Sequence, residues 1–242
     1  MGWFKHWFGT RYYSLLYGHR DVEDARQWAD AILEHWALPP GSVLLDLACG
    51  RGRHAALFAE AGMKVTGVDI SEASIEEARM NVPEAEFVVH DMREPFRPGT
   101  FDAVCCLFTS LGYFDDIADD RAVFRAVRDA LKPGGRFVLD FMNTAAVLRD
   151  LVTEERIEKE GVGFAIRRSC EHGVLVKCIT VQDGPASHRF EERVQALTPD
   201  QLEGMALEAG FMVEARTDGP DMVPFDPDRS QRFVLWMRKP RS

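Results

Sequence analysis

The stretch that decides how this chain folds is Leu44-Leu45-Asp46-Leu47-Ala48-Cys49-Gly50-Arg51-Gly52. Its apolar half predicts a buried strand over residues 43–47, and its glycines predict a tight turn after that strand. Strong helix formers follow at 53–61, and Gly62 stands where a glycine commonly ends a helix. The stretch therefore predicts a strand, a glycine turn and a helix in succession.

The same alternation continues to about residue 141. Further strands are expected at 64–68, 86–90, 102–107 and 136–141, with helices at 71–80 and 120–131. A helix at 198–210 and strands at 211–217 and 232–238 are expected near the end of the chain. Short strands that alternate with helices are typical of a parallel sheet covered on both faces. We predict an α/β fold with a doubly wound, mostly parallel, seven-stranded sheet.

A different pattern begins near residue 150. Three strand-like segments follow one another at 163–171, 174–182 and 186–194, separated by His172-Gly173 and Asp183-Gly184. Connections of this kind favour tight hairpins. We expect a small antiparallel insertion of three strands, in which residue 167 faces 178 and residue 178 faces 189.

Composition and charge narrow the possible partners. The 242 residues include 29 Lys and Arg against 39 Asp and Glu, a net charge of −10. This balance repels phosphate backbones and anionic lipid, so neither nucleic acid nor a membrane is expected as a partner. No apolar run approaches the ~20 residues that a membrane-spanning helix needs. We expect a cytoplasmic protein that is a monomer or a homodimer.

The cysteines indicate neither a metal site nor a disulfide framework. None of the five forms a C-x-x-C pair or lies at metal-ligand spacing with a histidine. Cys105 and Cys106 stand side by side in an expected strand and are interpreted as core residues. We expect reduced thiols and no bound metal.

The glycine turn by itself leaves two kinds of ligand open. Residues 50–55 fit G-x-G-x-x-G/A, and Asp69 ends the next expected strand, a pattern that also fits a dinucleotide site. A pyrophosphate bound at a helix N-terminus is an anion. Asp46, four residues before Gly50, places a carboxylate that opposes such an anion and suits a cationic ligand. An NAD(P)-dependent reductase is therefore the less favoured alternative.

Five motifs together resemble those of class I S-adenosylmethionine-dependent methyltransferases. The glycine stretch at 44–54 resembles their first motif, and V-T-G-V-D-I-S at 65–71 resembles the next. H-D-M-R-E at 90–94, F-D-A-V-C-C-L-F-T-S-L at 101–111 and L-K-P-G-G-R-F at 131–137 resemble the following three. The resemblance covers about residues 41–141 in the order and spacing of that family. It implies the Rossmann-like fold of these enzymes and S-adenosylmethionine as the cofactor.

The resemblance also implies roles for particular residues. The glycine loop would wrap the methionine part of the cofactor, Asp69 would accept hydrogen bonds from both ribose hydroxyls, Asp91 would bind the adenine amine, and Met92 would cover the ring. The residues expected to bind the cofactor are Tyr13, Tyr17, Asp46, Ala48, Cys49, Gly50, Gly52, Asp69, Ile70, Asp91, Met92 and Leu107.

A closer resemblance is to the small-molecule branch of these methyltransferases, which carries a β-stranded lid. Residues 12–17 and Ser230-Gln231-Arg232 resemble that branch, although Gln231 stands where proline is frequent. This resemblance implies three parts: aromatic lid helices at 1–40, a cofactor-binding core at 41–149 and 196–242, and a β insertion at 150–195 that covers the active site.

The seven aromatic residues between Trp3 and Tyr17 fit such a lid, in which Tyr13 and Tyr17 would attract the sulfonium. They also fit a helix packed on the core, or an oligomer contact through Trp3, Phe4, Trp7 and Phe8.

The residues that contact the methyl acceptor are harder to predict. The residues after the fourth strand, Leu107-Phe108-Thr109-Ser110, differ from the N/D-P-P-Y of enzymes that methylate adenine or glutamine amides. One face of the insertion mixes apolar and charged side chains and is expected to cover the cleft, although the alternative is that its charges are paired or solvated. The expected substrate contacts are Phe108, Thr109, Arg168, Lys177, Glu192 and Arg232.

Methyl transfer is an in-line displacement that depends mainly on alignment, and a general base is needed only for a protonated nucleophile. His188 is the expected base because the ordinary pKa of histidine lies near neutrality. The expected function is methyl transfer to an oxygen or nitrogen of a small molecule. The alternative is a cofactor-binding sensor or partner subunit without catalysis.

Overall fold

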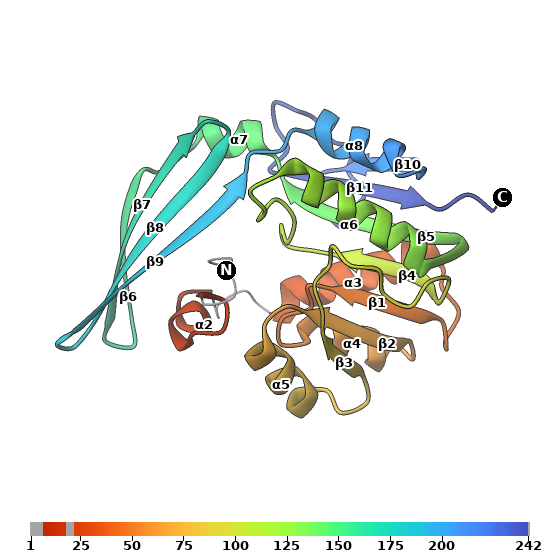
Figure 1. Cartoon of the computed structure of the whole chain (residues 1–242), viewed down its shortest axis with the longest axis horizontal. Helices are drawn as coiled ribbons and strands as arrows, with labels where there is room; N and C mark the ends of the chain where they lie inside the picture. Colours follow the sequence, from red (N-terminus) through yellow and green to blue (C-terminus); the bar gives the residue numbers. More distant parts are fainter. Residues whose placement is uncertain (1–6, 18–21, 242) are drawn as a thin grey trace.

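The computed structural model describes residues 7–17 and 22–241, and the predicted contacts of Trp3 and Phe4 lie outside them. The core sheet has seven strands in the order β10-β11-β5-β4-β1-β2-β3 (Figure 1). Its strands are β1 (Val43–Leu47), β2 (Lys64–Asp69), β3 (Glu86–Val89), β4 (Phe101–Cys106), β5 (Leu131–Met142), β10 (Met212–Thr217) and β11 (Arg232–Arg238).

Strands β1 to β5 pair in parallel, and β11 runs antiparallel to both of its neighbours. The predicted doubly wound, mostly parallel sheet is confirmed.

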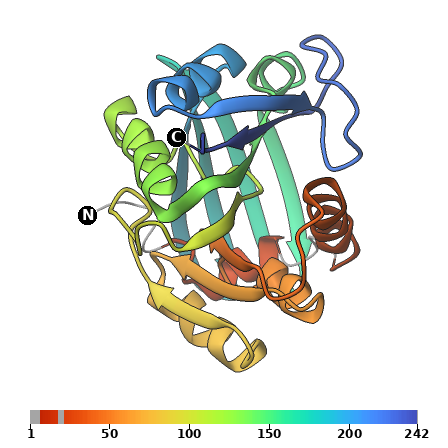
Figure 2. The ribbon, with the colours of Figure 1, turned by 90° about the vertical axis from the view of Figure 1, so that its right-hand side faces the viewer.

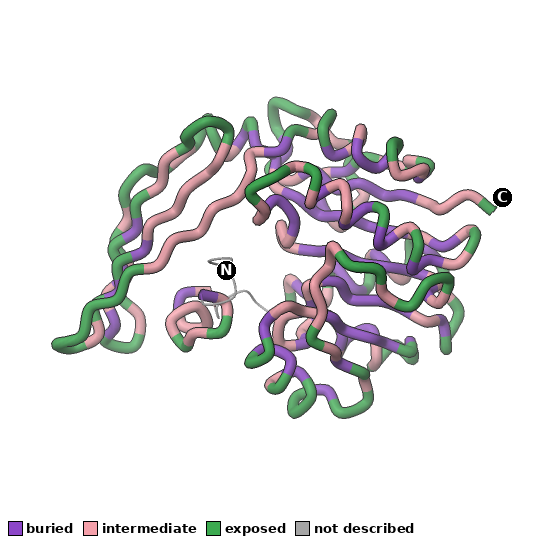
Figure 3. Tube along the Cα trace, in the orientation of Figure 1, coloured by how far each residue is buried: buried purple, intermediate pink, exposed green. Residues whose placement is uncertain are grey.

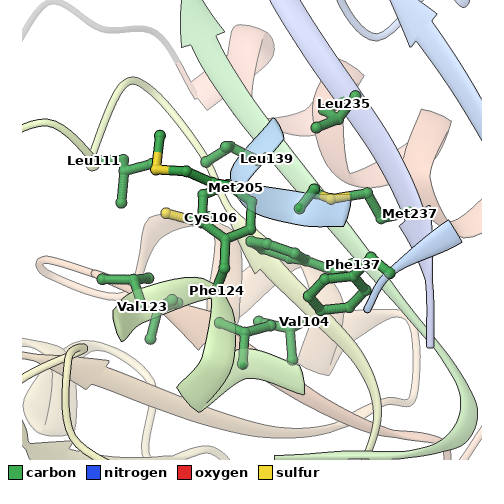
Figure 4. Packing of buried hydrophobic residues seen from close by; sticks show 14 of the residues in the cluster. Val104, Cys106, Leu111, Val123, Phe124, Phe137, Leu139, Met205, Leu235 and Met237 are labelled. Atoms are coloured by element: carbon green, nitrogen blue, oxygen red, sulfur yellow. The ribbon is translucent and has the colours of Figure 1, made fainter. Parts of the chain in front are cut away.

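Helices cover both faces of this sheet. They are α3 (Val22–Trp36), α4 (Arg53–Glu60) and α5 (Glu72–Asn81) on one face and α6 (Ile117–Ala130) and α8 (Pro199–Glu208) on the other. Helix α2 (Arg11–Tyr17) packs instead on a second sheet, and α7 (Thr144–Arg149) follows β5 in the chain. Apolar residues of α3, α4 and α5 form one buried cluster with the sheet, and those of α6 and α8 form another. Because side chains alternate along a strand, Cys105 enters the first cluster and Cys106 the second. Figure 4 shows Cys106 beside Phe124 of α6 and Met205 of α8.

Local capping explains where several helices begin. Ser71 accepts the N–H of Ser74 at the start of α5. Thr198 and Gln201 form a capping box at α8, with Pro199 in its first turn, as the sequence predicts. Helix α6 begins three residues before the expected residue 120, because the carboxylate of Asp116 accepts the N–H of Ala118 at 2.8 Å.

The second sheet has four strands, so the expectation of three was wrong. The additional strand, β6 (Glu154–Lys159), pairs with β7 (Val162–Glu171), and β8 (Val174–Asp183) and β9 (Ala186–Gln195) complete the order. Strand β6 is E-E-R-I-E-K, and its residues alternate between exposed and half-buried. Such a charged edge strand lacks the apolar pattern by which strands are recognised, and it also discourages pairing with other chains.

The pairing of this sheet corrects one predicted register. Arg167 faces Cys178, as expected. The second turn is formed by Gly184 and Pro185, however, so Cys178 faces Glu191 and not residue 189. This shift of two residues leaves every side chain on its predicted face, because side chains alternate with a period of two.

The second sheet stands beside the core, and Figure 2 shows its strands behind the core sheet. Trp7 and Leu16 pack on its inner face, against the buried side chains of Phe164, Ile166 and Ile179. Figure 3 shows that its strands are mostly half-buried or exposed, whereas the core strands are largely buried. Among the described helices, none is long and apolar enough to cross a membrane.

Candidate active site

A cavity of about 670 Å³ opens at the carboxyl ends of β1, β2 and β4. Most residues predicted to bind the cofactor line it: Tyr13, Tyr17, Asp46, Ala48, Cys49, Gly50, Asp69, Ile70, Asp91, Met92 and Leu107. They come from α2 and from the ends of four strands. The parallel sheet brings them together because the carboxyl ends of its strands meet at one edge.

Gly52 lies outside this lining, so the structure does not place it in contact with a ligand. It stands at the N-cap of α4 with a φ of 82°. A Cβ on Gly52 would lie 2.9 Å from the Phe87 ring, closer than packing allows. Gly52 therefore shapes the loop, whereas Gly50, where a Cβ would meet nothing within 4 Å, faces the open cavity.

Asp46 places an incompletely paired carboxylate inside the cavity. Its side chain is 2% exposed, and its Oδ2 has no hydrogen-bond partner within the described part of the chain. Burial and the nearby charge of Asp69 raise the pKa of Asp46 to about 7. A carboxylate held in this way is stabilised by a cation, so its surroundings fit a ligand that carries positive charge.

Asp69 ends β2 at the opposite side of the glycine loop. Its Oδ2 accepts the N–H of Gly50 at 3.0 Å, and its Oδ1 accepts the N–H of Ser71 at 2.8 Å. Burial raises the pKa of this carboxyl. Each oxygen retains acceptor capacity, so Asp69 can receive hydrogen bonds from a pair of vicinal hydroxyls.

Asp91 is also in the lining, but its carboxylate is shared with Arg93. Arg93 donates to Asp91 Oδ2 at 2.6 Å and to Asp119 at 2.9 Å. The guanidinium also lies over the Phe114 ring, 4.8 Å from its centroid. Arg93 is part of the H-D-M-R-E motif, but its role was not predicted from the sequence.

A hydrogen-bond network centred on Glu192 joins α2 to the second sheet. Glu192 Oε1 accepts the indole N–H of Trp7 at 2.6 Å and the hydroxyl of Tyr17 at 2.7 Å. Lys177 contacts the Tyr17 hydroxyl, and its Nζ lies 3.8 Å from Glu192. Two predicted substrate residues and one predicted cofactor residue thus meet in one network beside the cavity.

A second cavity of about 430 Å³ adjoins the first. All six predicted substrate residues line it: Phe108, Thr109, Arg168, Lys177, Glu192 and Arg232. Phe108, Tyr113 and Glu192 line both cavities, so the two spaces meet at these side chains. Asp24 also lines the second cavity, but it was not predicted from the sequence. An acidic residue in the first turn of an amphipathic helix is ordinarily interpreted as a solvent-exposed side chain.

The residues between the cavities have an unusual backbone conformation. Phe108 and Thr109 have φ values of 60° and 57°, in the left-handed region that side chains disfavour. Asp140, which is fully buried, accepts the N–H of Phe108 at 2.7 Å. Arg232 donates to the same carboxylate and, at 3.1 Å, to the Thr109 hydroxyl. Asp140 was not predicted, since one acid within an apolar strand carries little sequence signal.

The structure does not bring His188 into the site. Its side chain is exposed and lines neither cavity, and its ring centroid lies 5.1 Å from that of Tyr12. His188 is four residues from Glu192 along β9, which at the usual rise of a strand is about 13 Å. His188 therefore lies beyond the cavities, and the structure does not support the prediction that it is the base.

A different histidine, His54, lines the first cavity. Its ring is buried, lies 5.1 Å from the Phe108 ring, and has an Nε2 without a hydrogen-bond partner in the described residues. Burial and the adjacent Arg53 lower the pKa of His54 to about 3. A neutral imidazole thus stands where the two cavities meet.

The fold and the lining of the two cavities together fit a Rossmann-like protein that binds a cationic nucleoside. Comparison with known proteins narrows this class. A family described as "Methyltransferase domain" matches residues 44–135. A dTDP-3-amino-3,4,6-trideoxy-alpha-D-glucopyranose N,N-dimethyltransferase of Streptomyces venezuelae is 30% identical over 86% of this chain and 92% of its own. A putative methyltransferase of Bacillus subtilis, YqeM, is 29% identical over 95% of both chains.

Solved structures show the same fold. A S-adenosylmethionine-dependent methyltransferase from Clostridium acetobutylicum has a TM-score of 0.82 at 21% identity, covering 95% of this chain and 96% of its own. An amino pentose methyltransferase from Micromonospora echinaspora has a TM-score of 0.72 at 24% identity, over 95% and 97% of the two chains. The chain belongs to the class I S-adenosylmethionine-dependent methyltransferases.

Proposed function

We propose that this methyltransferase transfers the methyl group of S-adenosylmethionine to an oxygen or nitrogen of a small molecule bound in the second cavity. The observation that carries the proposal is that two cavities meet at Phe108, Tyr113 and Glu192. One cavity has the strand-end carboxylates that suit a cationic nucleoside. The other has a volume of about 430 Å³, within the range of small-molecule sites.

The residues of the first cavity are assigned to binding the cofactor. Asp69 holds the ribose hydroxyls, Asp91 with Arg93 meets the adenine edge, and Ile70 and Met92 cover the ring. Asp46 supplies negative charge beneath the glycine loop. When bound there, the cofactor supplies a methyl group made electrophilic by its sulfonium.

The remaining parts are assigned to excluding water and aligning the acceptor. Helix α2 and the second sheet, joined through Glu192, cover the two cavities, and Phe108 lines the junction at which the two ligands meet. Alignment of this kind can supply ~7–11 kcal/mol of the barrier reduction. We assign residues 1–40 to the lid, 41–149 and 196–242 to the core, and 150–195 to the insertion.

The assignment to a free cytoplasmic enzyme, monomeric or homodimeric and without a nucleic-acid partner, is also a proposal. It is supported by the net charge of −10 and by Cys49, Cys105 and Cys106, which are buried as free thiols.

Calorimetry with S-adenosylmethionine, S-adenosylhomocysteine and NADH tests the cofactor assignment. Micromolar binding of NADH without binding of S-adenosylhomocysteine would overturn it. A screen of small metabolites for release of S-adenosylhomocysteine then tests catalysis. Tight cofactor binding with no turnover of any metabolite would favour the alternative function, a cofactor-binding sensor or partner subunit without catalysis.

A further inference from the structure

The charges around the second cavity are nearly all paired with one another. Arg168 lies 2.5 Å from Glu155, Arg232 lies 2.7 Å from Asp140, and Lys177 lies 3.8 Å from Glu192. Each cation in the cavity wall therefore already faces a carboxylate. An anionic acceptor group would have to displace one of these carboxylates in a partly desolvated space, which is costly.

Asp24 is the exception among these charges. It is half-buried in the first turn of α3 and lines the cavity, and within the described residues it has neither a hydrogen-bond donor nor a cation as partner. The wall and its paired neighbours thus hold four carboxylates (Asp24, Asp140, Glu155 and Glu192) against three cations (Arg168, Lys177 and Arg232). The net charge of one negative unit resides on Asp24.

One further observation places this negative charge near the junction of the two cavities. Burial raises the pKa of Asp140, Arg232 opposes that rise, and the charge of Asp24 adds to it. Asp24 therefore lies close to the carboxylate that holds Phe108, the residue shared by both cavities.

The remaining wall of the cavity is mainly apolar, apart from the hydroxyl-bearing side chains of Thr109 and Tyr113. Met142, Val147, Leu151, Leu175 and Val194 line it together with the Phe108 ring. A ligand that fits this surface has an apolar body and one positive charge. Protonated amines have this character, whereas carboxylates, phosphates and neutral alcohols leave the charge of Asp24 without a partner.

We propose that the methyl acceptor is a small molecule carrying one ammonium group, and that Asp24 binds that group. This inference rests on the proposed function and deepens it by naming the chemical class of the acceptor. It also distinguishes this cavity from a site for a sugar bearing a diphosphate, which would require cations that are not already paired.

The test uses three sets of matched probes on the full chain saturated with S-adenosylhomocysteine. These are benzylamine, benzyl alcohol and benzoate; cyclohexylamine, cyclohexanol and cyclohexanecarboxylate; and glucosamine, glucose and glucuronate. Ligand-observed NMR measures the binding of each. We expect the amine of at least one set to bind more tightly than its two partners. An equal response from the three members of every set, including no response at all, overturns the inference.

Substitution of Asp24 supplies the second half of the test. Asp24→Asn keeps the shape of the side chain and removes its charge, and is expected to weaken amine binding by about tenfold or more without changing alcohol binding. Asp30→Asn, an exposed position on the same helix, is the matched control and is expected to change neither. Unchanged amine affinity in Asp24→Asn overturns the inference.

The cofactor provides a separate control. Wild type and both variants are first titrated with S-adenosylhomocysteine. If wild type fails to bind it, the proposed function fails. If all three bind it equally and amines show no preference, only the ammonium inference fails.

Discussion

Arg232 on the last strand of the core sheet forms an ion pair with Asp140 on the adjacent strand β5, and this pair supports the backbone between the two cavities. The side chain of Asp140 is fully buried, whereas that of Arg232 is 30% exposed. The same carboxylate accepts the N–H of Phe108, whose φ is 60°. A strained conformation of this kind persists only where its surroundings hold it. The pair thus links the stability of the core to the geometry of the site.

Replacing Arg232 is expected to destabilise the whole chain. Arg232→Leu leaves the Asp140 carboxylate buried without its cation and should lower the free energy of unfolding by about 3–5 kcal/mol. Urea denaturation measures this change. Arg229→Leu removes a neighbouring, largely exposed arginine and should stay within about 0.5 kcal/mol of wild type. Equal effects of the two substitutions would show that the buried pair does not support the core.

Asp69 is expected to contribute to cofactor affinity. Asp69→Ala removes the carboxylate that would receive the ribose hydroxyls and should weaken S-adenosylhomocysteine binding by roughly 1–3 kcal/mol. Isothermal titration calorimetry measures the difference. Glu86→Ala, on the neighbouring strand and paired with Arg97, is the control and should leave the affinity unchanged. An Asp69→Ala variant with wild-type affinity would remove Asp69 from this role.

Asp46 is expected to make cofactor binding dependent on pH. Its pKa of about 7 in the ligand-free protein means that its carboxyl is largely protonated below that pH. A cationic ligand favours the ionised form, so binding of S-adenosylmethionine should release a proton near pH 6.5 and strengthen as the pH rises toward 8. Calorimetry in two buffers of different ionisation enthalpy measures the proton release.

The corresponding variant provides the control for this pH dependence. Asp46→Asn has no carboxyl to titrate and should lose the part of the proton release that belongs to Asp46. The ionised carboxylate is costly to bury, so the folded chain binds more protons than the unfolded chain between the ordinary pKa of Asp and about 7. Wild-type stability should therefore fall relative to Asp46→Asn as the pH rises through that window. Identical pH profiles for the two proteins would contradict the assignment.

Gly50 and Gly52 of the same loop are expected to differ in their effects on stability and on cofactor affinity. Gly52→Ala would place a Cβ 2.9 Å from the Phe87 ring at a φ of 82°, so it should reduce stability through both a clash and backbone strain. Gly50→Ala meets nothing within 4 Å and should cost only the strain, about 1–2 kcal/mol, while its methyl group obstructs the cavity. Thermal unfolding and S-adenosylhomocysteine titration of the two variants separate the effects. The affinities are compared at a temperature at which both variants are fully folded. A larger loss of cofactor affinity in Gly52→Ala than in Gly50→Ala would contradict the assignment of Gly50 to the cavity and of Gly52 to the shape of the loop.

His188 is expected to be dispensable for catalysis. Its exposed ring packs near Tyr12 and lies outside both cavities, so His188→Asn should change kcat by less than about twofold, far below the ~10²–10⁴-fold that a general base contributes. The assay is release of S-adenosylhomocysteine with an acceptor identified by the metabolite screen. A hundredfold loss of kcat with unchanged KM would restore His188 as the base.

Features encoded by neighbouring residues could be predicted from the sequence. The alternation of strands and helices, the caps at Ser71 and Thr198, and the outward and inward faces of the second sheet all follow from local patterns. Strand β6 could not be found in this way because every residue of its E-E-R-I-E-K sequence except Ile157 is charged. The second turn of that sheet was misplaced by one residue because Asp183-Gly184 and Gly184-Pro185 are both plausible turn sequences.

The sequence by itself indicated the carboxylates that line the first cavity. Asp46, Asp69 and Asp91 lie at or just beyond the carboxyl ends of their strands, and parallel strands bring these ends to the same edge of the sheet. The sequence also predicted Glu192 and Arg232 in the second cavity. Only the tertiary structure showed that Asp24 lines the same cavity, that Asp140 pairs with Arg232, and which of these charges have partners. The physical reason is that the electrostatic effect of a charged side chain depends on whether an opposite charge lies beside it. Residues that are far apart in the sequence become such partners only through tertiary packing. Local spacing can place a carboxylate at a strand end, but it cannot show which carboxylate remains without a cation.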